Sequence, residues 1–228
     1  LKNYASGIWH SPFDYKNRAM IYLPEDLPEP SQPQYTHQLM QAMLPVIKSS
    51  DGRAFLLFTS YRAMNEANDF LKQRLDYPIF VQGQKPKHQL LAAFKDAGQA
   101  VLLGTSSFWE GVDVRGEALT CVMIDKLPFA SPGDPVLQAR MDQIRHNGGN
   151  PFMDFQLPTA VISLKQGAGR LIRDLTDYGV LVIGDPRIIH KQYGKMFIKS
   201  LPEMPVTQSI QAVEGFYQQI RQKAKVPA

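Results

Sequence analysis

The sequence is poor in the residues that bind metals. Its 228 residues include one cysteine, Cys121, so a disulfide within the chain is excluded. A zinc site or iron–sulfur cluster built on several thiolates of this chain is excluded for the same reason. The five histidines include no pair four residues apart, the spacing that places two imidazoles on one helix face. We therefore predict no metal site in this chain and a reducing compartment, the cytoplasm.

Long apolar runs are also lacking. None approaches the roughly 18 residues that a membrane-spanning helix needs, and the first seven residues lack the charged region and apolar core of a secretory signal. We therefore expect no contact with a membrane. The first residue is Leu1 rather than methionine, so we interpret the sequence as a piece of a longer protein.

Charge is unevenly distributed along the chain. The net charge is +4, and residues 191–228 account for all of it, with six basic and two acidic residues. A basic C-terminal end is compatible with a polyanion or an acidic protein partner. A solvated surface would have the same composition.

Apolar runs alternate with segments of helical periodicity, which indicates an α/β fold with a parallel sheet covered by helices on both faces. The predicted strands are residues 54–58, 79–81, 100–103, 119–124 and 179–183. The predicted helices are residues 35–48, with Thr36 as N-cap, and 63–75, 87–95, 134–146, 155–174, 186–199 and 207–223. Four prolines between residues 24 and 33 disfavour a helix there.

The same pattern suggests three parts of the chain. Residues 1–35 are predicted to be an extended arm, residues 36–200 the α/β domain, and residues 201–228 an amphipathic helix with a basic tail. Ligands of parallel sheets bind at the carboxyl ends of the strands. Chemistry is therefore expected in residues 59–62, 104–107, 125–126 and 185–187.

Two guanidiniums and an amide stand out in the predicted helix 155–174. At about 100° per residue, Gln166, Arg170 and Arg173 would project from one narrow stripe, opposite an apolar face. Two arginines one turn apart gain most from an anion between them, and a guanidinium fits phosphate oxygens. Gly167 and Gly169 would each cost about 1 kcal/mol inside a helix, so the sequence predicts a close approach there. The alternative is a solvated face with ordinary salt bridges.

A second group of polar residues, at positions 104–116, follows a predicted strand. Small hydroxyls after a strand can bind phosphate, and Thr105 and Ser106 are in this position. Glu110 and Asp113 lie three residues apart around Gly111, where they could hold an arginine, a ribose hydroxyl or a metal-bound water. A loop with capping residues is the alternative.

Three segments of this sequence, in this order and spacing, resemble motifs IV, V and VI of superfamily 2 helicases. They are Phe58-Thr59-Ser60-Tyr61, the run Gly104-Thr105-Ser106-Ser107-Phe108-Trp109-Glu110-Gly111-Val112-Asp113, and Gln166-Gly167-Ala168-Gly169-Arg170-Leu171-Ile172-Arg173. The middle run and the later Asp125-Lys126-Leu127-Pro128-Phe129 resemble the XPD/DinG family, and most closely its bacterial YoaA- or DinG-like DNA helicases. The likeness covers nearly all of residues 6–200. The phosphate loop, the Asp-Glu-x-His motif and the four cluster-binding cysteines of the family's first motor domain are not in this sequence.

The resemblance implies a second RecA-like motor domain of an ATP-dependent DNA helicase that moves 5′ to 3′ in repair or replication. ATP and Mg²⁺ would be shared with a first motor domain in cis, which would also carry the iron–sulfur cluster, and this chain alone would not hydrolyse ATP. By match to motif VI, Arg170 and Arg173 would be arginine fingers, and Gln166 would position the attacking water or the γ-phosphate. The implied nucleotide-binding residues are Glu110, Gly111, Asp113 and Gly169. The implied contacts to single-stranded DNA are Ser60, Tyr61, Arg62, Thr105, Ser106 and Lys126.

Two other functions are compatible with parts of the sequence. The basic end and the helix 207–223 suit a protein-interaction module that docks a replisome or single-strand-binding protein subunit, although this helix could instead pack on its own domain. A stand-alone enzyme that binds a nucleotide or sugar phosphate would need a glycine-rich strand-to-helix turn, which residues 82–85 do not supply.

Overall fold

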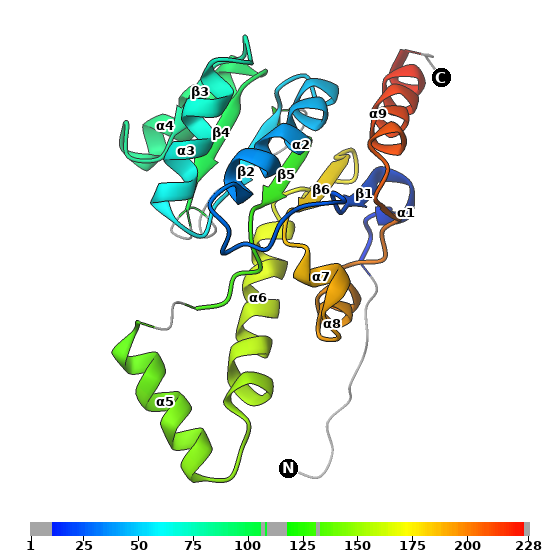
Figure 1. Cartoon of the computed structure of the whole chain (residues 1–228). Coiled ribbons are helices and arrows are strands. Elements are labelled where there is room, and N and C mark those ends of the chain that lie inside the picture. Colours follow the sequence, from blue (N-terminus) through cyan, green and yellow to red (C-terminus); the bar gives the residue numbers. More distant parts are fainter. Residues whose placement is uncertain (1–10, 106–107, 109–117, 131–132, 226–228) are drawn as a thin grey trace.

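The computed structural model describes residues 11–105, 108, 118–130 and 133–225. Within these residues the strands form one seven-stranded sheet in the order β3-β4-β2-β5-β6-β1-β7, and each neighbouring pair is parallel (Figure 1). The strands are β1 (Ala19–Tyr22), β2 (Ala54–Leu57), β3 (Ile79–Val81), β4 (Val101–Gly104), β5 (Cys121–Ile124), β6 (Gly179–Ile183) and β7 (Val206–Thr207). The predicted parallel α/β sheet is confirmed.

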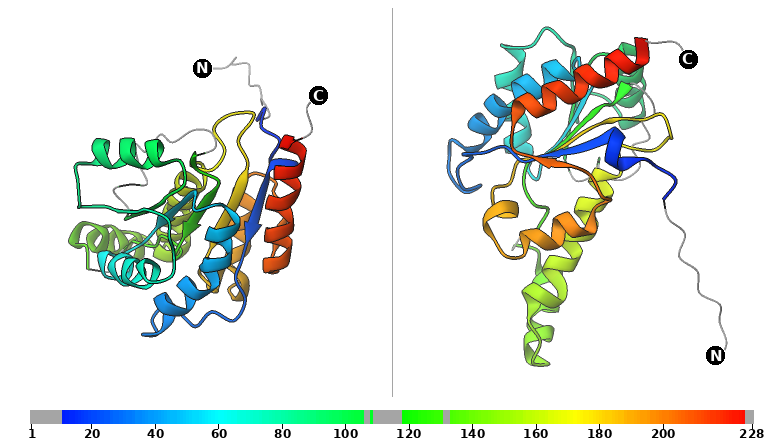
Figure 2. Two further views of the ribbon diagram at one scale, coloured as in Figure 1. Left: turned by 90° about the horizontal axis from the view of Figure 1, so that it is seen from above. Right: turned by 90° about the vertical axis from the view of Figure 1, so that its right-hand side faces the viewer.

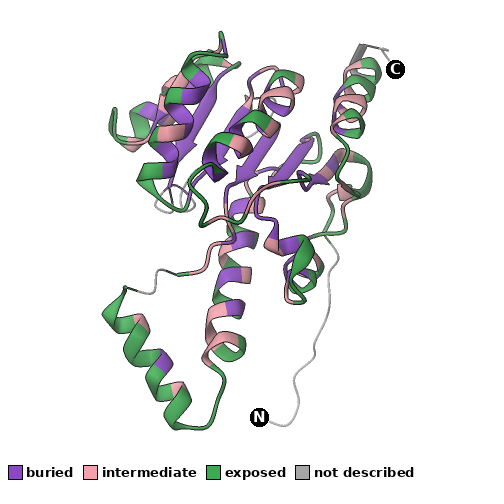
Figure 3. Ribbon diagram, viewed as in Figure 1, coloured by how far each residue is buried: buried purple, intermediate pink, exposed green. Residues whose placement is uncertain are grey.

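The central strands are apolar without interruption because both of their faces are covered. Every residue of β2, β4, β5 and β6 is buried (Figure 3). Their side chains alternate between two apolar clusters, one on each face of the sheet. Phe55 and Leu57 of β2 belong to one cluster, and Ala54 and Leu56 belong to the other. This double burial is why such strands appear in a sequence as continuous apolar runs.

The direction of each crossover decides which face its helix covers. Where the chain crosses to a strand nearer the β3 edge, the connecting helix packs on one face of the sheet; these helices are α2 (Tyr35–Ser49) and α3 (Tyr61–Lys72). The last helix of the chain, α9 (Ile210–Lys225), packs on the same face. Helices on connections toward the β7 edge pack on the other face: α4 (Lys87–Ala97), α6 (Leu157–Ala168), α7 (Arg187–His190) and α8 (Gly194–Ser200). A constant crossover hand in a parallel sheet produces this separation.

A helical arm projects from the body of the domain beyond the end of β5 (Figures 1 and 2). It consists of α5 (Pro135–His146), the π-helix η3 (Phe152–Gln156) and the first part of α6. Asp134 caps α5 by accepting hydrogen bonds from the backbone N–H of Val136 and Leu137, at 2.8 and 3.1 Å, so the predicted cap is confirmed. Met141 is the one buried residue of α5.

The first 35 residues contain a strand of the sheet, contrary to the predicted extended arm. After the short helix α1 (Tyr15–Arg18), β1 pairs with β6 on one side and β7 on the other. Ala19, Ile21 and Tyr22 are buried. The proline cluster begins only after this strand, at Pro24, and the apolar residues directly before it form a strand because they pair with β6 and β7.

The predicted helix 155–174 ends early, at Ala168. The backbone N–H groups of Arg170 and Leu171 bond to the carbonyls of Gly167 and Ala168, both at 3.1 Å, so the chain tightens into turns. Leu171 and Ile172 then enter the core outside any helix. The prediction that Gln166, Arg170 and Arg173 share one helical stripe is therefore wrong. Gly169 is the C-cap of α6 rather than an interior residue, so the free-energy cost of a glycine inside a helix does not apply to it.

Three further differences concern predicted helices. The helix predicted at 186–199 is two helices, separated by an extended residue at Lys191. The two pack so closely that a Cβ at Gly194 would lie 2.0 Å from the Ile188 carbonyl oxygen, so only glycine fits there. Residues 206–207 form β7 rather than the start of a helix. Helix α2 begins at Tyr35 as predicted, but its N-cap is Gln34 rather than the predicted Thr36.

The C-terminal helix α9 packs its apolar side on its own domain. Val213 and Tyr217 are buried among the residues of α2 and the sheet. The Tyr217 hydroxyl donates to the Thr120 carbonyl at 2.7 Å, and Arg221 donates to Asp51 and to the Ser49 carbonyl. In the described part of the chain, no helix has the length and apolar character needed to cross a bilayer.

Candidate functional site

The carboxyl edge of the sheet contains a topological switch between β2 and β5. The chain leaves β2 toward the β3 edge and leaves β5 toward the β7 edge. Connections that diverge in this way leave a crevice where ligands of parallel sheets bind. Residues 59–62 and 125–126, two of the four segments in which the sequence predicts chemistry, begin at this crevice.

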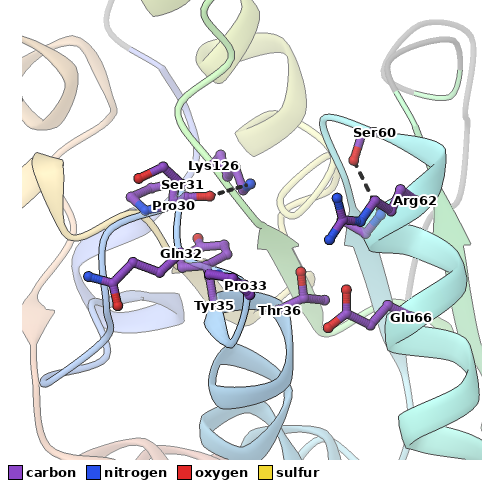
Figure 4. A pocket seen from close by; sticks show the side chains of 11 residues that line it. Pro30, Ser31, Gln32, Pro33, Tyr35, Thr36, Ser60, Arg62, Glu66 and Lys126 are labelled. Carbon is purple, nitrogen blue, oxygen red and sulfur yellow. Dashed lines mark hydrogen bonds between the residues drawn. The ribbon is translucent and has the colours of Figure 1, made fainter.

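A cavity of about 260 Å³ opens at the switch (Figure 4). The structure brings Ser60, Arg62 and Lys126 together around it, and these are three of the residues predicted to contact DNA. The complete lining comes from the Pro-rich segment, the first turns of α2 and α3, and the residue after Asp125: Pro30, Ser31, Gln32, Pro33, Tyr35, Thr36, Ser60, Arg62, Ala63, Glu66 and Lys126. Two cations, one carboxylate and several hydroxyls therefore surround the cavity, which suits an anion.

The first turn of α3 forms one wall of this cavity. Ser60 is the N-cap, and its Oγ accepts a hydrogen bond from the Ala63 backbone N–H at 3.2 Å. Arg62 and Glu66 reach from α3 toward Thr36 at the start of α2 (Figure 4). Because a helix N-terminus carries partial positive charge and free N–H groups, this wall attracts an anion beside the Arg62 guanidinium.

Lys126 closes the other side of the cavity in a fixed position. Its Nζ donates to the Pro30 carbonyl at 2.8 Å and lies 4.8 Å from the centre of the Tyr35 ring. An ammonium has three donors, so this contact leaves two for a ligand. The Pro-rich segment thus orients a cation at the cavity.

Asp125 ties the loop after β2 to the loop after β5. Its carboxylate accepts from the Thr59 backbone N–H at 2.9 Å, from the Thr59 hydroxyl at 3.2 Å and from the Lys126 backbone N–H at 2.6 Å. The Tyr35 hydroxyl donates to the Asp125 carbonyl and, at 3.2 Å, to that of Gly184. Burial raises the pKa of the Asp125 carboxyl to about 7, although these hydrogen bonds favour the charged form.

An ion pair between a buried carboxylate and a partly buried guanidinium fixes the next loop along the same edge. Asp185, which follows β6, accepts from the Leu127 backbone N–H at 2.8 Å and pairs with the Arg187 guanidinium at 2.5 to 3.1 Å. The Arg187 guanidinium also lies 5.6 Å from the centre of the Phe129 ring. Arg187 is therefore engaged within the domain, and Asp185 holds the loops after β5 and β6 together.

A side-chain amide connects three loops at the β3 side of the edge. Gln82, directly after β3, accepts at Oε1 from the Thr105 backbone N–H at 2.6 Å and from its hydroxyl at 3.0 Å. Its Nε2 donates to the Tyr61 hydroxyl at 2.7 Å. Thr105 is 5% exposed, so its hydroxyl faces protein rather than solvent. Gln82 is not among the residues predicted from the sequence; its position at the end of a predicted strand is the signal that could have identified it.

Arg170 and Arg173 lie in the loop 169–178, at the opposite edge of the sheet. This loop leads into the amino end of β6, whereas Ser60, Thr105 and Lys126 follow carboxyl ends. The buried Asp177 carboxylate accepts from the backbone N–H groups of Arg173 and Asp174, at 2.8 and 2.9 Å. This cap fixes the backbone that carries Arg173. Gln166 is exposed near the end of α6, within two turns of this loop.

Several predicted site residues lie outside the described part of the chain, namely Ser106, Glu110, Gly111 and Asp113. Cys121 is buried in β5, and burial raises the pKa of its thiol to about 12. Among the described residues, no three His, Cys, Asp or Glu side chains cluster as metal ligands would.

Residues 43–204 match the model of the helicase C-terminal domain family. The chain belongs to this family. It is 50% identical to the ATP-dependent DNA helicase YoaA of Escherichia coli over 200 residues, which cover 88% of the chain and 31% of that protein. It is 44% identical to YoaA of Haemophilus influenzae, over 96% of the chain and 34% of that protein. It is 39% identical to the ATP-dependent DNA helicase DinG of Photobacterium profundum, over 84% of the chain and 29% of that protein.

The chain therefore spans about a third of the length of the curated relatives it matches. Among solved structures, Xpd4 of S. tokodaii superposes with a TM-score of 0.62 at 15% identity, covering 85% of the chain and 39% of Xpd4. The C-terminal domain of the DEAD-box protein Dbp5 superposes with a TM-score of 0.54 at 14% identity, covering 90% of the chain and 98% of the Dbp5 domain. At these identities the likeness shows the fold, and the predicted RecA-like domain is confirmed. The predicted XPD/DinG family is confirmed by the family model and by the YoaA and DinG relatives.

Proposed function

We propose that this chain is the second motor domain of an ATP-dependent DNA helicase and that the cavity between β2 and β5 forms part of its single-stranded DNA track. The observation that supports this most is the cavity itself. In a domain of the helicase C-terminal family, it gathers Ser60, Arg62 and Lys126 at the switch point of the sheet.

The cavity suits a nucleic-acid backbone because its donors recognise phosphate and carry no base information. Arg62 and Lys126 supply charge, and Ser60 supplies a hydroxyl beside the N-terminus of α3. We assign Ser60, Arg62 and Lys126 to direct contact, with Ser106 as a further contact from motif V. Thr105, which is buried, would then position its loop rather than touch DNA.

The ATP site would lie at the other edge, in a cleft shared with a first motor domain in cis. Arg170 and Arg173 fit a triphosphate because two guanidiniums occur in one loop whose backbone Asp177 fixes. They would stabilise charge on the transferring phosphoryl group, a role worth roughly 10³–10⁵ in rate. Gln166 would orient water or the γ-phosphate, and Glu110, Gly111, Asp113 and Gly169 would border the nucleotide. The first domain would hold Mg²⁺, so this chain alone is expected not to turn over ATP.

Movement from 5′ to 3′ in DNA repair or replication, and an iron–sulfur cluster in the first motor domain, are further parts of the proposal. One buried cysteine does not fit a cluster that needs several thiolates, so this chain would not ligate it. A replisome or single-strand-binding protein subunit would have to meet the exposed face of α9, which carries Gln211, Gln218, Gln219 and Gln222, because the apolar face packs inside the domain.

The test is binding of labelled single-stranded DNA, followed by fluorescence anisotropy across a series of salt concentrations. Arg62→Ala and Lys126→Ala should each weaken binding. Each should also reduce the salt slope, which is the steepness with which log affinity falls with log salt concentration, by about 0.7 for each phosphate that is no longer neutralised. Lys72→Ala is the matched control, because this exposed lysine lies at the far end of the same helix α3. Equal effects of Lys72→Ala and Arg62→Ala, or no binding at low salt, would contradict the proposed track.

A further inference from the structure

An exposed aromatic ring is anchored at both ends beside the proposed track. Tyr61 is the first residue of α3, and it is 56% exposed at the carboxyl edge of the sheet. The helix cap at Ser60 fixes its backbone, and Gln82 fixes its hydroxyl. The ring therefore presents a face to solvent in a defined orientation.

The orientation of the Gln82 amide follows from its partners. The Thr105 backbone N–H can only donate, so the atom that accepts from it at 2.6 Å must be Oε1. Nε2 then faces the Tyr61 hydroxyl and donates to it. The backbone of Gln82 is also fixed, because its N–H bonds to the Leu103 carbonyl of β4 at 2.9 Å.

We infer that the Tyr61 ring is a stacking platform for a nucleobase of the bound strand, and that Gln82 is the positioning residue that holds it. This inference rests on the proposed function, since it concerns the same DNA track. The neighbouring residues Ser60 and Arg62 line the phosphate cavity. Because Tyr61 stands between these two residues in the chain, the base next to a phosphate bound in that cavity is the one that this ring would meet.

Stacking on this ring is tolerant of sequence because every base has a π-face. It therefore adds affinity without base selection, as a motor that moves along any sequence requires. The restraint by Gln82 lowers the ordering cost of binding, since the ring is already held before the base arrives. The same amide fixes Thr105, so the platform and the start of the loop after β4 are held by one side chain.

The experiment compares two labelled oligonucleotides of equal length, one of thymidines and one with abasic sites in place of the nucleosides. Both carry the same phosphates, so only the first can stack. Tyr61→Ala should weaken binding of the thymidine strand about 5- to 100-fold and leave the abasic strand unchanged. The salt slope of DNA binding by Tyr61→Ala should equal that of the wild type, whereas Arg62→Ala should reduce the slope for both strands.

A second readout separates positioning by Gln82 from general stability. The fluorescence of 2-aminopurine in the strand should be quenched on binding the wild type, and less so on binding Gln82→Ala or Tyr61→Phe, because each variant removes the hydrogen bond between the amide and the ring hydroxyl. Gln82→Glu should restore the quenching, because a carboxylate accepts from both Thr105 and the Tyr61 hydroxyl. Leu175→Ala is the matched control, because Leu175 has similar exposure at the opposite edge of the sheet.

The outcomes distinguish the two proposals. Equal weakening of both strands by Tyr61→Ala, or no weakening of either, overturns the platform while the phosphate track stands. Absence of binding to either strand by the wild type at low salt overturns both.

Discussion

The carboxyl group of Asp125 is buried at the boundary between the sheet and the cavity. It connects Thr59 and Lys126, and the Lys126 ammonium itself turns away toward Pro30. Two backbone N–H groups and one hydroxyl solvate the carboxylate, yet burial dominates and places its pKa near neutrality, at about 7. The Asp125 carboxyl therefore changes its charge near neutral pH, and the charge at the crevice changes with it.

The raised pKa of Asp125 predicts a pH dependence of stability. The folded form holds its proton more tightly than the unfolded form, whose pKa is about 3.9, so the free energy of unfolding should fall as pH rises from about 4 to about 7. Asp125→Asn keeps an oxygen for the Thr59 and Lys126 N–H groups and removes the titration. Its urea-derived unfolding free energy should match the wild type at about pH 4 and exceed it at about pH 8.

The exposed Asp134 provides the control for this comparison, because asparagine also caps a helix well. Asp134→Asn should follow the wild-type pH profile. Identical pH profiles for Asp125→Asn and the wild type would show that Asp125 is not the titrating group.

Helix α9 is an integral part of the domain. Its buried residues Val213 and Tyr217 complete the apolar cluster on the α2 side of the sheet, and β7, just before it, extends the sheet beside β1. Truncation before residue 206 would remove both elements, so it would expose core rather than delete a separate docking helix.

Single substitutions on α9 test this assignment. Tyr217→Phe removes a buried hydrogen bond to the Thr120 carbonyl, which keeps its bond from the Val180 N–H; the unfolding free energy should fall by about 1 kcal/mol. Val213→Ala should lower it by roughly 2 kcal/mol through weaker packing. Gln219→Ala, on the exposed face, should change it by less than about 0.5 kcal/mol in the same urea titration. Equal stability of all three variants would show that α9 does not pack as described.

Elements with a strong pattern were predictable from the sequence, and those defined by distant partners were not. Strand β2 and helix α3 follow from apolar runs and helical spacing. Strand β1 is as short as β2 but adjoins the proline cluster, and β7 has only two residues, so both are strands because of their pairing, β1 with β6 and β7 with β1. The end of α6 depends on tight turns and on the buried Asp177, whose partners no periodicity reveals. At the site, strand ends indicated Ser60 and Lys126, whereas Gln82 matters through contacts with two other loops.

At the scale of the whole molecule, the sheet separates two groups of predicted site residues. Ser60, Arg62 and Lys126 follow carboxyl ends of strands, and the loop with Arg170 and Arg173 precedes the amino end of β6. In the proposed helicase, a single strand bound at the first edge would not reach the arginine loop directly. Coupling between the proposed DNA binding and ATP hydrolysis would then have to pass through this domain or through the proposed first motor domain.

For the proposed helicase, this separation predicts that DNA binding and ATP hydrolysis can be impaired independently. Arg170→Ala with Arg173→Ala should leave single-stranded DNA binding by this chain within about twofold of the wild type, with an unchanged salt slope, since each phosphate left without its cation would reduce that slope by about 0.7. In a protein that joins the chain to a first motor domain, the same pair should reduce ATP hydrolysis by about 10³-fold or more. Arg62→Ala should do the reverse: weaker DNA binding by the chain, with ATP hydrolysis at saturating DNA retained. A double arginine variant with weaker DNA binding and a smaller salt slope, but an unchanged thermal unfolding midpoint, would instead put those arginines on the DNA track.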